Sequence, residues 1–246
     1  MNQMLIHEKA DQAIGHFAVA GQFLDRMTYG SGHINDTYLV KFNQKDGSVV
    51  QYILQRMNHE IFRKPEELME NIAGVTAHLR KKIIEAGGDP ERETLNIIPT
   101  IEGKPYYKDD AGLYWRMYKF INGATSYDRV EKPDDFYQSA VTFGHFQRLL
   151  ADYPAYTLHE TITAFHDTAA RYQTFLQAVE EDVCHRAADV QAEIEFVKKH
   201  EETAHVLMDM LNNGELPLRV THNDTKLNNI MIDDKTGKGL CVIDLD

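Results

Sequence analysis

The sequence predicts a two-lobed α+β fold in which a strand-rich first half leads into a helical second half. Three observations support this. The first half alternates short apolar runs with turn residues, the second half repeats apolar residues at helical spacing, and a polar turn near the C-terminus precedes two short strands. We expect lobes over residues 1–121 and 122–246, with a hinge near Phe120–Gly123. A cleft between two lobes is a common place for a ligand site.

The strands of the first half are predicted from their turns. Apolar runs over residues 39–42 and 49–54 flank Asp46-Gly47, a pair typical of a tight hairpin. Turn residues separate three further short apolar runs. These expected strands cover residues 96–98, 104–107 and 113–118.

Helices are predicted from spacing and from their end signals. Pro65 followed by two glutamates is a favourable first turn, and Gly87-Gly88 ends the apolar pattern that follows. Three more stripes at helical spacing fill the second half. They run from Phe136 to Leu150, from Phe165 to Val183 and from Val190 to Leu211.

Composition excludes several classes of protein. The 246-residue chain has a formal net charge of −12, which repels nucleic acid and anionic membranes, so neither is an expected partner. No stretch approaches the roughly 20 apolar residues of a membrane span, and the first residues lack the blocks of a signal peptide. Cys184 and Cys241 have no metal-type spacing, which favours buried free thiols. We expect a cytoplasmic protein.

The most informative segment is a His-x-Asp turn at residues 222–224. Asp224 can accept a proton from a substrate hydroxyl, and Lys226 can neutralise a transferring phosphoryl group. Asn229 opens the next strand and Asp244 ends the one after it, and their oxygens suit magnesium. Each polar residue alone would be read as a turn or cap. Their joint spacing predicts phosphoryl transfer, which depends on positioning and charge neutralisation.

A glycine-rich segment near the N-terminus is a second candidate. Gly30, Ser31 and Gly32 let backbone N–H groups approach phosphate oxygens, and Asn35 and Thr37 follow as further cofactor-binding candidates. The alternative is an ordinary hairpin loop, because two nearby glycines are weak evidence.

The strand over residues 52–56 is a third candidate. Phosphotransferases of the kinase type place a Lys on such a strand to hold the nucleotide phosphates, but this strand has none. Gln55 occupies the Lys-like position by alternation, and a bulge would bring in Arg56 instead. A surface Gln-Arg pair is the alternative. Glu70 is a candidate orienting partner, or an ordinary solvated helix residue.

Together these segments resemble the aminoglycoside phosphotransferase and choline kinase superfamily, whose fold is protein-kinase-like. That superfamily carries His-x-Asp, then Asn, then Ile-Asp, as at His222, Asn229 and Ile243-Asp244. Within it, the residues of these motifs most resemble those of the N-acetylhexosamine 1-kinases. The similar phrases cover residues 29–38, 52–58, 223–229 and 242–246.

The resemblance implies ATP and Mg²⁺ as cofactors and a sugar as the partner. Phosphate would pass to the anomeric hydroxyl of an N-acetylhexosamine, with adenine near the hinge at Tyr118 and Ile121. Relatives continue well beyond the metal-binding Asp, here Asp244, so we expect a truncated C-terminal lobe. Two alternatives remain. One is a kinase for an aminoglycoside, choline or homoserine, and the other is an inactive nucleotide-binding pseudokinase.

Overall fold

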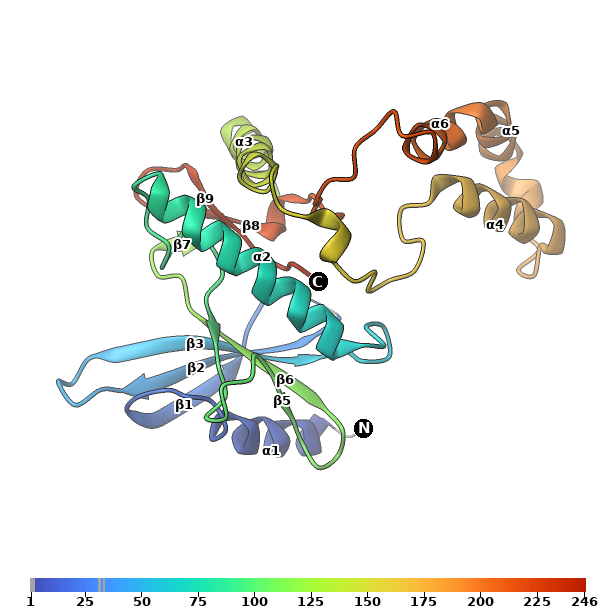
Figure 1. Ribbon diagram of the computed structural model, residues 1–246. Coiled ribbons are helices and arrows are strands. Elements are labelled where there is room, and N and C mark those ends of the chain that lie inside the picture. Colours follow the sequence, from blue (N-terminus) through green and yellow to red (C-terminus); the bar gives the residue numbers. More distant parts are fainter. Residues whose placement is uncertain (1–2, 31, 33) are drawn as a thin grey trace. The chain divides into compact units, whose positions relative to one another are not determined.

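The computed structural model describes residues 3–30, 32 and 34–246. It contains two compact units (Figure 1). The main unit combines the described residues up to Thr161 with Val220–Asp246, and the helical unit is Ile162–Arg219. The expected lobe boundary at residue 121 falls inside the main unit and stays a prediction.

The main unit begins with an antiparallel sheet in which the strands follow the order β1-β2-β3-β6-β4, and β5 pairs with β6. The predicted hairpin is confirmed, since Asn43 pairs with Val49 across the Asp46-Gly47 turn. The expected strand over 104–107 is shorter and later. The bounds are β1 Gln22–Thr28, β2 Asp36–Asn43, β3 Val49–Met57, β4 Ile97–Ile98, β5 Tyr107–Lys108 and β6 Tyr114–Lys119.

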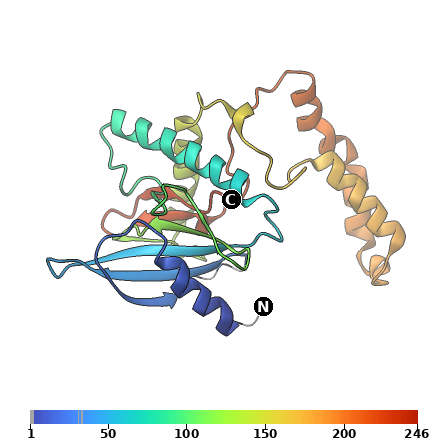
Figure 2. The same cartoon turned by 60° about the horizontal axis from the view of Figure 1, so that its bottom comes forward.

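Two helices lie on opposite sides of this sheet (Figures 1 and 2). Helix α1 (Gln3–Ile14) buries Ala10 and Ala13 against the sheet core. Neither α1 nor β1 is predicted from the sequence, because α1 presents small apolar residues and β1 is largely exposed, so its sequence lacks alternation. Helix α2 (Pro65–Glu85) has the predicted bounds and ends before Gly87, whose φ is +76°.

A second sheet of the main unit holds the C-terminal segment. Its strands β7 (Ala124–Thr125), β8 (Ile230–Asp233) and β9 (Gly239–Val242) pair in that order. Helix α3 (Pro133–Leu149) packs so closely on β9 that a Cβ at Gly239 would collide with the Thr142 side chain and lie 3.1 Å from the Gln138 carbonyl oxygen. Glycine is therefore required there by the close approach of the helix.

The predicted stripe on α3 is partly wrong. Phe143, Phe146 and Leu150 are buried, but Phe136 is 67% exposed. The N-terminal part of the buried face carries polar residues instead, because the carboxylate of Asp135 accepts hydrogen bonds from backbone N–H groups at the helix start. Sequence periodicity counts apolar residues and misses a buried face of this kind.

The helical unit contains α4 (Thr168–Glu181), α5 (Gln191–Lys199) and α6 (Glu201–Asn212), with a short 3₁₀ turn at Ala187–Val190. The single stripe expected from Val190 to Leu211 is wrong, because the chain breaks at His200. Lysines in the last turn of α5 and glutamates in the first turn of α6 both favour that break.

Two smaller expectations have mixed outcomes. Cys241 is buried as predicted, whereas Cys184 is exposed, since α4 ends at a left-handed Asp182 before reaching it. Within the described residues, no helix is both long and apolar enough to cross a bilayer.

Candidate active site

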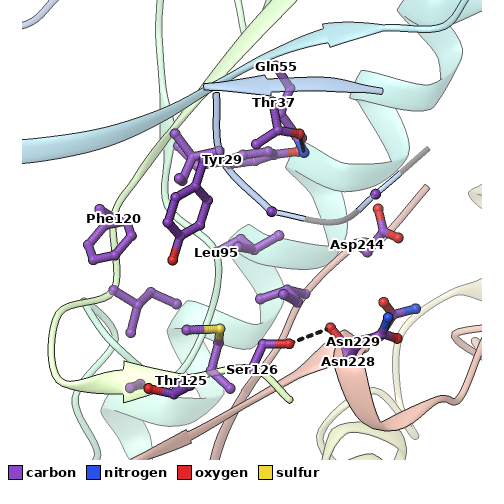
Figure 3. Close-up of a pocket in the computed structure, with 18 of the residues that line it drawn as sticks. Tyr29, Thr37, Gln55, Leu95, Phe120, Thr125, Ser126, Asn228, Asn229 and Asp244 are labelled. Carbon is purple, nitrogen blue, oxygen red and sulfur yellow. Dashed lines mark hydrogen bonds between the residues drawn. The ribbon is translucent and has the colours of Figure 1, made fainter. Parts of the chain in front are cut away.

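A cavity of about 540 Å³ lies within the main unit, between the first sheet and the C-terminal hairpin. Figure 3 shows Tyr29, Leu95 and Phe120 on one side of it, and Asn229 and Asp244 on the other. One part of the lining is therefore apolar and the other polar, as an adenine ring and a phosphate chain would require.

The apolar part contains both predicted adenine-binding residues. Tyr118 and Ile121 line the cavity and are 5% and 6% exposed. The rings of Tyr29 and Phe120 meet edge to face with centroids 5.8 Å apart. These flat side chains can enclose a planar base, which agrees with the expected position of the hinge.

On the sheet wall, the structure places Gln55 and not Arg56 in the cavity. The Gln55 amide donates a 3.0 Å hydrogen bond to the Thr37 hydroxyl on β2. The guanidinium of Arg56 instead pairs with Asp36, at 2.5 Å. Regular alternation along β3 accounts for this, since Asp36 and Arg56 are cross-strand partners with no bulge between them.

The glycine-rich segment borders the same wall. Gly30 has a φ of +80°, and both Gly30 and Gly32 line the cavity. A Cβ added to either glycine would have no atom within 4 Å of it. Open space beside exposed backbone suits the approach of a phosphate. Ser31 lies outside the described residues. Asn35 lies just past this segment, and its amide donates to Asp246 at 2.7 Å.

The His-x-Asp turn and the residues after it form a compact polar group. The Lys226 ammonium lies 2.8 Å from the Asp224 carboxylate. The Asn229 amide nitrogen donates to the Asp224 carboxylate at 3.1 Å and to its main-chain carbonyl at 2.9 Å. Burial opposes ionisation of Asp224, but these contacts outweigh it and lower the pKa of the carboxyl. Asp224 is thus an anion at neutral pH and able to accept a proton.

His222 connects this turn to the segment that carries Asp244. Its Nε2 lies 2.8 Å from the carbonyl oxygen of Ile243, and its ring meets Phe143 edge to face. The histidine is 7% exposed. It therefore braces the loop.

Asp244 occupies a left-handed backbone conformation with φ +60°, and it lines the cavity. Desolvation and then repulsion by Asp246 raise the pKa of Asp244. Such a carboxylate gains from a nearby cation.

The donor set fits magnesium. Because Asn229 uses its amide nitrogen on Asp224, its oxygen is the atom left for an ion, and Asp244 adds a carboxylate. In the described part of the chain, no three or more His, Cys, Asp or Glu side chains are arranged so that they could hold a metal ion. Magnesium commonly takes one or two carboxylates and completes its shell with substrate phosphates, so this small set suffices.

Besides Arg56, a second predicted residue is not brought to the site, and a charged residue that lines it was missed from the sequence. Glu70 lies on the exposed face of α2 and pairs with His159 at 2.8 Å, so the expected pairing with Gln55 or Arg56 is not formed. Arg116 lines the cavity from β6, and its Nε donates to the Gln55 side chain at 3.0 Å. The available signal was a charged residue inside the apolar run over 113–118.

An antiparallel sheet facing an acidic turn across a ligand cavity defines the kinase-like class of α+β folds. Residues 26–246 match the phosphotransferase enzyme family known as APH, and this match covers nearly the whole chain. The chain belongs to this phosphotransferase family.

Solved structures share the fold at low identity. An aminoglycoside phosphotransferase from Alicyclobacillus acidocaldarius subsp. acidocaldarius DSM 446 is 11% identical, with 96% of this chain and 65% of that chain covered and a TM-score of 0.54. The amicoumacin kinase hAmiN, in complex with AMP-PNP, Ca²⁺ and Ami, is 12% identical, with coverages of 100% and 64% and a TM-score of 0.52. AMP-bound spectinomycin phosphotransferase APH(9)-Ia is 11% identical, with coverages of 97% and 69% and a TM-score of 0.54. The chain thus spans about two thirds of the length of these proteins.

Proposed function

We propose that this protein is an ATP- and Mg²⁺-dependent phosphotransferase that places the γ-phosphate on a hydroxyl of a small molecule. One observation carries the proposal. Lys226, Asn229 and Asp244 line the polar part of a cavity whose other part is apolar, and Asp224 contacts both Lys226 and Asn229. The nucleotides bound in two of the related solved structures, AMP-PNP and AMP, agree with ATP as the donor.

Each residue has a distinct task in the transfer. Asp224, ionised and oriented by Asn229, accepts the proton of the attacking hydroxyl. Lys226 offsets negative charge as the phosphoryl group moves. Asn229 and Asp244 would hold magnesium, which supplies charge neutralisation on the phosphates. The backbone near Gly30 and Gly32 has room to approach the phosphates.

For the acceptor we propose the anomeric hydroxyl of an N-acetylhexosamine. The support is the resemblance of residues 223–229 to the phrase found in N-acetylhexosamine 1-kinases. The cavity also offers polar groups to a sugar. The side-chain oxygen of Asn228 is buried and has no hydrogen-bond partner among the described atoms, and the Ser126 hydroxyl donates to the Asn228 main-chain carbonyl at 2.8 Å. An unpaired buried oxygen favours a ligand that donates a hydrogen bond.

The test is a panel of acceptors with labelled ATP and Mg²⁺. N-acetylglucosamine and N-acetylgalactosamine are compared with their methyl glycosides, in which the anomeric hydroxyl is blocked. We expect label to pass to the free sugars only. Transfer to an aminoglycoside, choline or homoserine would refute the acceptor and keep the reaction type. Nucleotide binding with no transfer to any acceptor would favour the pseudokinase alternative.

A further inference from the structure

A buried ion pair that the proposed reaction does not use borders the cavity, which Arg116 lines and Asp246 does not. Arg116 on β6 is 1% exposed, and the Asp246 side chain is 7% exposed. The guanidinium binds both carboxylate oxygens, through a close contact to Oδ1 and a 2.8 Å hydrogen bond to Oδ2. A bidentate pair of this kind fixes the orientation of both partners.

The Asp246 carboxylate has a second hydrogen-bond partner, Asn35. Its Oδ2 accepts the 2.7 Å hydrogen bond from the Asn35 amide, and Asn35 in turn accepts a 2.9 Å hydrogen bond from the backbone N–H of Asn58. One carboxylate therefore joins strand β6 to the residue that follows the glycine-rich segment. Both of these belong to the sheet wall, whereas Asp246 belongs to the segment that follows β9.

These contacts bear on Asp244, because Asp246 follows it closely in the chain. Asp244, the candidate metal ligand, lies between two fixed points. On one side His222 holds the Ile243 carbonyl oxygen, and the Ile243 N–H donates to the Asn229 main-chain carbonyl at 2.9 Å. On the other side Arg116 and Asn35 hold Asp246. A left-handed residue between two anchored neighbours has little freedom to move.

We propose that Asp246 is a positioning residue, which binds Arg116 and Asn35 so that Asp244 is held for the metal ion against the sheet wall. This inference rests on the proposed function, because it concerns the same metal site. Stability alone does not account for this ion pair. Burying two charges costs about as much free energy as their attraction returns, so an apolar pair would stabilise the fold equally well. A metal ligand, in contrast, needs a fixed geometry.

The experiment measures how much Mg²⁺ is needed for half-maximal binding of ADP by calorimetry, with ADP binding in the absence of metal as the reference. The variants are Asp246→Asn, Arg116→Lys and Asp233→Asn. Asp233 is the matched control, because its side chain is 11% exposed, close to the 7% of Asp246, and pairs with an arginine at 2.9 Å. That arginine, Arg92, does not line the cavity, whereas Arg116 does.

We expect Asp246→Asn to need about 10- to 100-fold more Mg²⁺ while its metal-free ADP affinity changes less. Arg116→Lys keeps the charge but cannot make both contacts, so its Mg²⁺ requirement should rise in the same direction by a smaller factor. Asp233→Asn should keep the wild-type requirement. If Asp246→Asn does not fold, Arg116→Lys decides.

Three outcomes separate the possible errors. A wild-type Mg²⁺ requirement in a folded Asp246→Asn, or in Arg116→Lys when the first does not fold, would overturn this inference alone. An equal rise in Asp233→Asn would also overturn it, since the effect would then be general loosening. Failure of the wild-type protein to bind nucleotide with Mg²⁺ would instead refute the proposed function.

Discussion

The main unit and the helical unit differ in what they bury. The main unit buries an extensive apolar core together with charged and polar groups such as Arg116, His222 and Asn229. Of residues 162–219, all of which the structure describes, only Tyr172 and Ile194 are buried. Buried polar groups need a rigid frame to satisfy them, and only the main unit supplies one.

The order of the chain adds to this contrast. The main unit is interrupted at Thr161 and resumes at Val220, just before the His-x-Asp turn. Every residue assigned a role in the transfer therefore belongs to the main unit. The comparison teaches that the candidate site draws its residues from the main unit alone, and the predictions below test whether the helical unit is dispensable for it.

The largest expected effect is at Asp224. Asp224→Asn should leave ATP affinity unchanged and slow phosphoryl transfer about 10²- to 10⁴-fold, or about 3 to 5 kcal/mol, because a positioned base is lost. Asp209→Asn on the exposed surface of α6 is the matched change in the helical unit. Steady-state ADP release with the best acceptor measures both. Equal rates for the two variants would remove the contrast between the units.

The next largest effect is on stability and compares two isoleucines, Ile230, which is 0% exposed, and Ile194, which is 4% exposed. Ile230→Ala in β8 should destabilise the protein by about 3 to 4 kcal/mol, in the upper half of the range for such changes, since its surroundings cannot collapse into the cavity that is left. Ile194→Ala should cost nearer about 2 kcal/mol, because its loosely packed neighbours can relax.

Urea unfolding followed by far-UV circular dichroism gives both values, and nucleotide binding reports on the main unit. We expect Ile194→Ala to keep wild-type nucleotide affinity. Loss of binding in this variant would show that the units are coupled.

A smaller effect is expected at Asp244. Asp244→Ala should remove most of the Mg²⁺ dependence of ATP binding, lowering affinity with Mg²⁺ by about 10-fold or more. Metal-free affinity should stay near the wild-type value. Calorimetric titration with and without Mg²⁺ measures the difference. Identical affinities in the wild-type protein under the two conditions would contradict the metal role.

The smallest effect is a pH dependence of the main unit. The hydrogen bond from Arg92 and those from Thr236 lower the pKa of Asp233 to about 2 from an ordinary value of 3.8. Because the folded-state pKa is the lower one, this stabilisation is complete above about pH 4 and is lost as the pH falls toward 2. Asp233→Asn should flatten the stability profile in this range. A profile unchanged by the substitution would show that the contact adds nothing in solution.

Much of the fold follows from local sequence signals. The hairpin turn at Asp46-Gly47, helix α2 and the apolar β6 run are all recognisable without tertiary information. Helix α1 and strand β1 are not, because their apolar residues are few and acquire meaning only against the rest of the sheet. The break at His200 depends on charges that periodicity ignores.

The candidate site also has some residues that local sequence signals predict and others that only the tertiary structure brings in. Asp224, Asn229 and Asp244 share one short segment, so their spacing alone predicts them. Regular alternation separates Gln55 from Arg56 only when β3 is known to pair without a bulge. Arg116 is 130 residues from Asp246 in the sequence, and nothing local in the chain indicates that they meet.

Gly239 shows how an uncharged position can limit the variation this site tolerates. Any side chain there would push α3 away from β9 at Thr142. The next residue along α3, Phe143, contacts His222, and His222 holds the main chain next to Asp244. In a library that encodes every amino acid at codon 239, selection for metal-dependent transfer should therefore recover glycine as strictly as selection at a catalytic codon, although this residue has no side chain to offer the chemistry.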